Sequence, residues 1–385
     1  MKHLTLLYLS LFFNFLIYSD PLLVAVLMVK NEEPVMETTL QPLVDAGITD
    51  FLIYDTGSTD KTIQVTHDFF IKNKISNFVI KQGEWIDFAT SRNKALELTE
   101  QYFPNATFML MLDAEWILHN GKELLKYCNE QKNNSAQIYC IKLFGSNIHF
   151  YHSRLIRCKS NVKFVGKIHE EPNIAPQVKV PNIIYFEFTP TDYGQEKTET
   201  RWLKDRYILL EELQKDPTNS RNLFFLGQTN FALGDFSHAI ECFKLRSTMS
   251  GYDEENFLTV YFLAQSYQAL KDFEQMIDNY LKSFSMRPYR AEPLIKLAEY
   301  YYKINSYHLC YLFARHAATI AYPANDVSLI DSDLYNFTRY ALLSATAYIV
   351  GDFNLGKQAT FKALQAHPEI DYLYKNLQYY QEFLP

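Results

Sequence analysis

The stretch "MLMLDAEWIL", residues 109–118, decides how the first half of the chain is interpreted. Its first residues are apolar, as in a strand buried on both faces, and Asp113 and Glu115 follow directly. Two carboxylates this close together cost free energy if both are charged and unpaired. The stretch therefore predicts either a ligand site at the end of a buried strand or a solvated acidic turn.

Apolar runs alternate with helix-like stretches from residue 22 to about residue 190, which predicts a parallel sheet covered by helices on both faces. The predicted strands are 22–29, 51–55, 78–81, 108–112 and 138–144. The predicted helices are 35–46, 60–73 and 90–101. Because ligands bind beyond the carboxyl ends of the strands in such sheets, we expect Asp113 to lie where a ligand enters.

The acids at the strand ends favour a divalent cation and a phosphorylated ligand. Oxygen atoms are the ligands that Mg²⁺ and Mn²⁺ take, above all when substrate phosphates complete the coordination shell. A further acid, Asp55, ends the strand in "FLIYDTGSTDKT" (51–62), where Gly57 allows a ligand to approach the backbone closely. Asp55 is suited to accept hydrogen bonds from a base or a ribose, and the alternative is an ordinary strand-to-helix turn.

From about residue 195 the strands stop, and small and aromatic residues recur at a period of about 34 residues, which resembles the tetratricopeptide repeat, a helix pair. The recurring residues are Gly227, Gly234, Phe236, Ala239 and Phe243; Ala264, Tyr267, Phe273, Tyr280 and Pro288; Ala298, Tyr301 and Tyr307; and, after an insertion at 323–334, Gly351, Phe353, Gly356, Ala363 and Pro368. The tripeptide "GDF" occurs twice, as expected for a turn between helices. The alternative is an ordinary helical bundle.

The composition is that of a globular protein and excludes some classes of partner. A length of 385 residues suggests two domains. The net charge is -7 and there is no run of lysine or arginine, so we do not expect the chain to bind nucleic acid. The five cysteines are odd in number and lack close pairs, so we expect buried thiols rather than a zinc site or a disulfide framework.

The amino terminus carries an apolar run of about 15 residues after Lys2 and His3, shorter than the ~20 residues of a spanning helix. It is expected to be a signal peptide or a short membrane anchor over 1–19, and the alternative is an additional core helix. A signal would place the protein in the secretory pathway or at a membrane. Without one, the protein would be cytoplasmic.

Five ordered motifs together resemble the family 2 glycosyltransferases, which have the nucleotide-sugar-binding GT-A fold, and especially the bacterial subset joined to tetratricopeptide repeats. The motifs are "MVKNEE" (28–33), "YDTGSTDKT" (54–62), "WIDFATSRNKAL" (85–96), "LDAE" (112–115) and "RLIRCKSNVKFVGKIHE" (154–170). The resemblance implies an α/β GT-A domain with a Rossmann-like mixed sheet over 22–195. An all-α tetratricopeptide-repeat solenoid over 196–385 would follow.

The resemblance also implies roles for individual residues, stated here by their numbers in this chain. The residues expected to bind the nucleotide sugar are Asn31, Glu32, Asp55, Arg92 and Asp113. The expected metal ligands, for Mn²⁺ or Mg²⁺, are Asp113, Glu115 and His169. The expected catalytic residues are Asp113 and Glu170, the latter as the base, with Glu171 and Asp192 as alternatives. Asp60 is expected to order its turn.

The metal motif departs from the family, which usually has Asp at position 115. Glu115 is longer by one methylene, so the coordination geometry that the motif implies is in doubt. Trp116 follows it and is expected either to stack on the acceptor or sugar or to be an ordinary packing residue.

The resemblance implies a metal-dependent, inverting glycosyltransferase that uses a nucleotide-sugar donor, UDP-linked, and a protein, peptide or glycan acceptor. The repeats would bind the acceptor or a partner, or self-associate, or only stabilise the enzyme. The alternative function is a repeat scaffold with an inactive nucleotide-sugar-binding domain. A nucleotidyltransferase is disfavoured, because no glycine-rich loop with a basic residue follows the first strand.

Overall fold

The computed structural model describes residues 20–145, 147–175, 178–188 and 192–383, and for 192–199 it describes the backbone alone. The predicted signal peptide or anchor at 1–19 lies outside the described residues. None of the described helices combines the length and the apolar composition that a membrane span requires.

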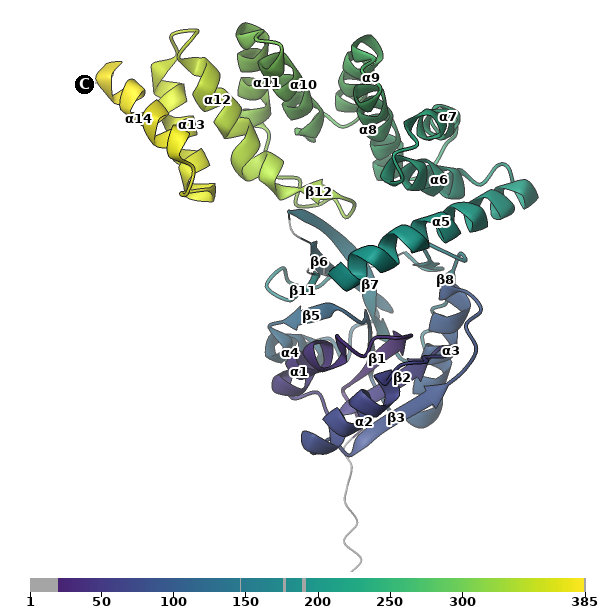
Figure 1. Cartoon of the computed structure of the whole chain (residues 1–385). Helices are drawn as coiled ribbons and strands as arrows, with labels where there is room; N and C mark the ends of the chain where they lie inside the picture. Colours follow the sequence, from purple (N-terminus) through teal and green to yellow (C-terminus); the bar gives the residue numbers. More distant parts are fainter. Residues whose placement is uncertain (1–19, 146, 176–177, 189–191, 384–385) are drawn as a thin grey trace, which may run out of the picture.

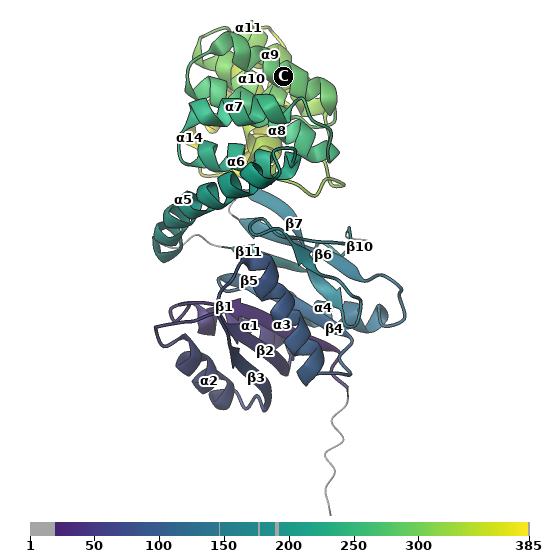
Figure 2. The same ribbon diagram turned by 90° about the vertical axis from the view of Figure 1, so that its right-hand side faces the viewer.

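The first half of the chain folds around a mixed sheet with the strand order β3-β2-β1-β4-β7-β6-β11-β5 (Figures 1 and 2). Its strands are β1 (Leu23–Val29), β2 (Asp50–Asp55), β3 (Asn77–Gln82), β4 (Phe108–Asp113), β5 (Trp116–His119), β6 (Ile138–Gly145), β7 (Ile148–Arg157) and β11 (Tyr185–Phe188). The strand β10 (Val178–Lys179) pairs with β6, and β8 (Phe164–Val165) and β9 (Glu171–Pro172) form a separate small pair. The helices of this half are α1 (Met36–Ala46), α2 (Thr62–Lys72), α3 (Phe88–Tyr102) and α4 (Gly121–Glu130).

The parallel part of the prediction is confirmed, because β1 pairs in parallel with β2 and β4, and β2 with β3. The five predicted strands correspond to β1, β2, β3, β4 and β6. The other part of the sheet is antiparallel, since β7 runs opposite to both β4 and β6, and β5 opposite to β11. The antiparallel pairs therefore involve β5, β7 and β11, three strands that were not predicted.

Alternate residues of β1 face different helices, which explains why the strand is apolar throughout. Ala25 and Leu27 pack in a cluster with α1, α2 and α4, whereas Val24 and Val26 pack with Ala95 of α3. The sheet is thus covered on both faces, as successive side chains of a strand point to opposite sides. The functional edge of the sheet lies between these two helical layers.

The second half is a row of helix pairs, and the long helix α5 crosses between it and the sheet domain (Figures 1 and 2). Its helices are α5 (Asp192–Lys215), α6 (Ser220–Ala232), α7 (Phe236–Arg246), α8 (Asp253–Ala269), α9 (Phe273–Met286), α10 (Glu292–Lys303), α11 (Tyr307–Thr319), α12 (Arg339–Ala347), α13 (Phe353–Ala366) and α14 (Asp371–Phe383), with a π-helix at Leu334–Thr338. The four predicted units correspond to the pairs α6/α7, α8/α9, α10/α11 and α12/α13.

The recurring spacing of these pairs has a local cause in the turn between the helices. Gly234 and Gly351 adopt positive φ angles of 75° and 77°, a conformation that glycine enters without steric cost. The next residue caps the second helix, as Asp235 accepts a hydrogen bond from the His238 amide at 3.4 Å. The tripeptide "GDF" therefore ends one helix and starts the next, as predicted.

The insertion at 323–334 returns from the helical half to the sheet. It contains β12 (Ile330–Asp331), which pairs in antiparallel orientation with the start of β7. The buried carboxylate of Asp326 accepts hydrogen bonds from Arg287 at 2.7 Å and from Arg290 at 2.9 Å. The insertion is thus fixed to the helix pairs at one end and to the sheet at the other.

All five cysteines are free thiols, as predicted; Cys158 is half-buried and the other four are buried. Burial raises the pKa of the Cys128 thiol to about 12, so this thiol is protonated at neutral pH. These cysteines are packing residues of the two halves.

Candidate functional site

The register of the parallel strands brings the predicted acids to one edge of the sheet. Met28 pairs with Asp113, while Val29 pairs with Asp55, and Asp55 in turn pairs with Gln82. All of these residues lie at the carboxyl ends of their strands. The backbone therefore brings the acidic strand ends together, as expected, at the edge where parallel sheets bind ligands.

The loops after β1 and β2 are joined by reciprocal hydrogen bonds. The Asn31 amide donates to Ser58 Oγ at 2.9 Å, and Asn31 Oδ1 accepts from the Thr59 amide at 2.7 Å. The Glu32 amide donates to Thr62 Oγ1 at 2.7 Å. Asn31 and Glu32 thus lie beside the β2 turn, and their backbones are held in place there.

The carboxylate of Asp55 is completely buried and is used within its own turn. It accepts hydrogen bonds from the Ser58 amide at 3.2 Å, from the Ser58 hydroxyl, and from the Gln82 side chain at 3.4 Å. Asp60 bridges the same loops, since it accepts from the Thr62 amide at 3.0 Å and from the Glu33 amide at 3.2 Å. In this structure Asp55 shapes the edge of the site through its turn, and Asp60 orders the turn as expected.

Arg92 joins two of the predicted functional acids. Its Nη2 atom lies 2.7 Å from Asp113 Oδ1, and its Nε atom lies 2.5 Å from Glu170 Oε1. The guanidinium is buried, with 2% of its residue surface exposed. Asp113 keeps 32% of its side-chain surface exposed, so one side of this cluster is open to a ligand.

A second arginine, Arg154 of β7, belongs to the same cluster. Its Nη2 atom lies 3.5 Å from Asp113 Oδ2 and 3.7 Å from Glu170 Oε1. The guanidinium lies over the ring of Trp116 at 5.2 Å and near the ring of Phe164 at 5.7 Å. Arg154 opens the "RLIRCKSNVKFVGKIHE" motif but was not among the predicted site residues.

The charges of the cluster determine its protonation. Burial alone would raise the pKa of Asp113, but Arg92 and Arg154 together lower it to about 2. Burial and the charge of Arg154 lower the pKa of His152 to about 3, so its imidazole is neutral at physiological pH. Two guanidiniums and two carboxylates therefore face one another, and an anionic ligand can compete with the carboxylates for the arginines.

Trp116 is buried, with 7% of its surface exposed. Its ring packs against His152 at 5.2 Å and against Phe186 at 5.4 Å, in addition to Arg154. Of the two roles expected for Trp116, the structure supports the packing role. The Trp116 ring thus packs against the Arg154 guanidinium.

The three expected metal ligands are not gathered into one set. Within the described residues no group of three or more His, Cys, Asp or Glu side chains is arranged to hold a metal ion. His169 lies with its ring stacked on Phe225 of α6, at a centroid distance of 3.9 Å. Glu115 lies two residues after the end of β4, in a left-handed backbone conformation with φ 76°. Of the expected ligands, Asp113 is the one that lies in the arginine cluster, so a divalent cation there would need further oxygen atoms from other groups, including a ligand.

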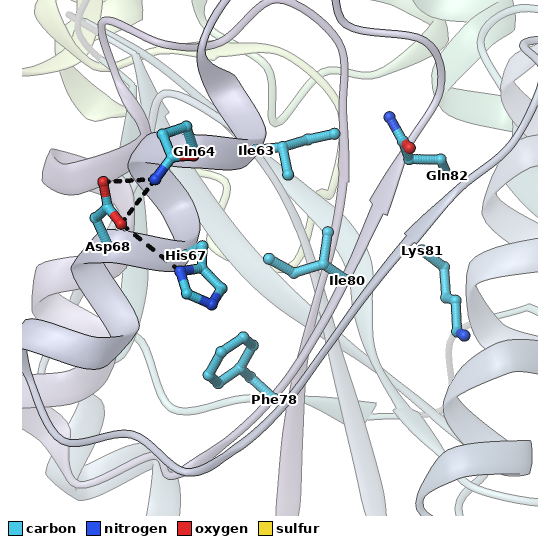
Figure 3. A pocket seen from close by; sticks show the side chains of 8 residues that line it. All are labelled: Ile63, Gln64, His67, Asp68, Phe78, Ile80, Lys81 and Gln82. Carbon is cyan, nitrogen blue, oxygen red and sulfur yellow. Dashed lines mark hydrogen bonds and ion pairs between the residues drawn. The ribbon is translucent and has the colours of Figure 1, made fainter.

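A depression of about 650 Å³ lies beside the Asp55 turn, between α2 and β3 (Figure 3). Its lining residues are Ile63, Gln64, His67, Asp68, Phe78, Ile80, Lys81 and Gln82. Gln82 belongs both to this lining and to the hydrogen bonds of Asp55. The depression therefore adjoins the acidic edge but includes none of the predicted site residues.

The chain was compared with known proteins, and no protein-family profile matches it. It is 26% identical over 254 residues to the SPbeta prophage-derived glycosyltransferase SunS of Bacillus subtilis (strain 168), a match that covers 61% of this chain and 55% of that protein. The same values hold for the glycosyltransferase SunS of Bacillus phage SPbeta. The chain thus spans about half the length of these relatives.

Solved structures align with the chain at low similarity. MamA aligns at 16% identity over 46% of this chain and 94% of its own, with a TM-score of 0.35. The C-terminal part of a TPR repeat-containing protein from Cytophaga hutchinsonii aligns at 9% identity over 48% of this chain and 66% of its own, with a TM-score of 0.38.

Proposed function

We propose that the chain is a glycosyltransferase that moves a sugar from a nucleotide-sugar donor, UDP-linked, to an acceptor, with inversion at the anomeric carbon. The observation that carries the proposal is the contact of Arg92 with both Asp113 and Glu170 at the carboxyl edge of a parallel sheet. The similarity to SunS, a protein named as a glycosyltransferase, supports the same reaction class.

Arg92 and Arg154 would meet the diphosphate of the donor. Their planar guanidiniums match phosphate oxygens and are already oriented by Asp113 and Glu170, so little side-chain freedom is lost on binding. When the anomeric C–O bond breaks, negative charge grows on the departing diphosphate. Prepositioned cations at this point stabilise the transition state more than the ground state.

Asp113 and Glu115 are the residues that would hold Mn²⁺ or Mg²⁺ together with the donor phosphates. Such a cation would add positive charge beside the departing diphosphate. His169 has no part in this proposal, because its ring is stacked against α6. Asn31, Glu32 and Asp55 would hold the nucleoside through the joined loops after β1 and β2, next to the depression lined by Gln82.

The helix pairs would present a protein, peptide or glycan acceptor to this edge, or mediate self-association. The aromatic segment at 299–313 serves partly for packing, since Tyr301 stacks on Phe313 at 5.5 Å, while Tyr302 is 41% exposed. Exposed aromatic rings of this kind suit recognition of a chain or a sugar face. This part of the proposal concerns the partner and is independent of the chemistry at Asp113.

The proposal is tested by titrating UDP into the full chain, with and without Mn²⁺, and by screening several nucleotide sugars for hydrolysis. We expect UDP to bind more tightly with Mn²⁺ and one donor to be hydrolysed, and Asp113→Ala to abolish hydrolysis. Absence of UDP binding under both conditions would instead favour the scaffold with an inactive domain.

A further inference from the structure

One face of α5 lies along the loop that leads to Glu170. Lys167 Nζ lies 2.9 Å from Glu212 Oε1, and Ile168 packs in a cluster with Leu209. Asp205 lies one helical turn before Leu209 and on the same face, because residues four apart in a helix are neighbours. The loop and α5 run in opposite directions here, so Asp205 lies beside the residues that follow Ile168.

Asp205 is a buried acid on α5. The residue is 7% exposed, and among the described residues no hydrogen bond or ion pair reaches its carboxylate. Burial and the nearby charge of Glu170 raise the pKa of Asp205 to about 6, against the opposing effect of Arg201 on its own helix. Buried carboxylates with a raised pKa occur where a function requires them.

The other candidate bases are engaged. Glu170 contacts Arg92 at 2.5 Å and Arg154 at 3.7 Å, and Glu171 forms an ion pair with Arg221 of α6 at 3.0 Å. Both carboxylates are thus already held by guanidiniums. The side chain of Asp192, the third candidate, lies outside the described residues.

We propose that Asp205, which the first helix of the second half carries to the Arg92 cluster, accepts the proton of the acceptor in the proposed reaction. Its carboxylate takes the proton of the acceptor X–H group, whose electron pair forms the new bond to the anomeric carbon. The bond between the anomeric carbon and the diphosphate oxygen breaks, and its electron pair leaves with the diphosphate. The inference rests on the proposed function, and Glu170 then acts as a positioning residue for Arg92.

Two charged groups act on Asp205, namely Arg201 on α5 and Glu170 on the loop. A pH profile must therefore be compared between wild type and an Asp205 variant rather than interpreted alone.

The test uses the full chain, UDP-glucose and UDP-N-acetylglucosamine as donors, and water as the acceptor. The rate of UDP release is measured from pH 4.5 to 9 for wild type, Asp205→Asn, Asp205→Glu and the control Glu211→Gln, which removes another carboxylate of α5. We expect Asp205→Asn to lower kcat by about 100-fold or more, a typical contribution of general base catalysis. We expect UDP affinity to stay within about twofold, and Asp205→Glu to recover part of the rate.

The wild-type rate should rise through about pH 6, and this rise should disappear in Asp205→Asn. A wild-type rate in Asp205→Asn, or a lower rate with an unchanged pH profile, would overturn the role of Asp205 and leave the proposed function standing. Failure of the wild-type chain to bind UDP or to hydrolyse either donor would remove both the proposed function and this inference.

Discussion

The Nη2 atom of Arg92 lies 2.7 Å from the Oδ1 atom of Asp113, at the point where α3 meets the end of β4. Arg92 is buried and also contacts Glu170, so one side chain bridges two acids that come from distant parts of the sequence. The pair is thus both a structural link and the centre of the proposed diphosphate site.

Arg92→Ala is expected to destabilise the fold by about 3–5 kcal/mol, because it leaves two carboxylates with Arg154 as their nearest cation. Urea unfolding at pH 7 measures this free energy. Lys94→Ala is the matched control on the same helix, since Lys94 is exposed and pairs with Glu97 at 3.0 Å. Its effect should stay below about 0.5 kcal/mol. An equal loss in both variants would contradict the importance of the buried contact.

Asp113 makes the free energy of unfolding depend on pH in the acid range. Its folded pKa of about 2 lies below the ordinary value of 3.8, so it contributes stability above pH 4 that is lost as the pH falls toward 2. In Asp113→Asn this contribution should be absent, and the fall in the free energy of unfolding from pH 5 to pH 2.5 should be smaller than in wild type. Urea unfolding at several pH values measures the difference. Parallel curves for the two proteins would argue against the ion pairs.

Arg154 should contribute to ligand binding. Arg154→Met removes the second guanidinium while keeping an unbranched side chain over Trp116. We expect the Kd for UDP to rise by about tenfold, equivalent to about 1.4 kcal/mol, and the salt dependence of binding to weaken. Calorimetry at two salt concentrations checks both. Unchanged affinity would indicate that Arg154 only neutralises Asp113.

Asp205→Asn should stabilise the fold while it reduces activity. The raised pKa of Asp205 means that stability is highest when the group is protonated and falls as the pH rises from about 4 through 6. Removing the charge should therefore increase the free energy of unfolding at pH 7, on the order of 1 kcal/mol. Thermal unfolding at pH 5 and pH 7 measures the change, and Glu211→Gln again serves as the control.

Gly227→Ala tests the helix pairs. A Cβ atom on Gly227 would lie 2.5 Å from the ring of Phe243, closer than real contacts allow, so we expect a loss of about 1–3 kcal/mol. The double variant Gly227→Ala with Phe243→Leu should recover part of this loss, because the smaller side chain leaves room. If the two effects simply add, the helices do not approach each other at this point.

The parallel half of the sheet could be predicted because its strands are continuous apolar runs, each followed by a helix. The strand β7 was missed because its sequence, "IHFYHSRLIR", interrupts the apolar pattern with His149, His152 and Arg154. One of these polar residues, Arg154, supplies the second guanidinium of the candidate site. A functional strand is therefore difficult to recognise from periodicity alone.

The motifs assigned Arg92, Asp113 and Glu170 to one predicted site, whereas the ion pairs between them and the position of Asp205 could not be predicted. The sequence of α5 carries charged residues on all sides, so only the packing of Leu209 against Ile168 defines its covered face. In the same way, the stacking of His169 on Phe225 depends on how the two halves meet. Contacts between distant segments decide these positions, and no local pattern encodes them.

The antiparallel pairing of β12 with the start of β7 has a consequence for biosynthesis. The chain emerges from the ribosome amino terminus first, so the sheet domain and α5 are exposed long before residues 330–331 have been translated. Until then this part of β7 has an open edge that can pair with another nascent chain. The sheet is therefore completed late in synthesis, and a shortened transcript would yield a product prone to aggregate.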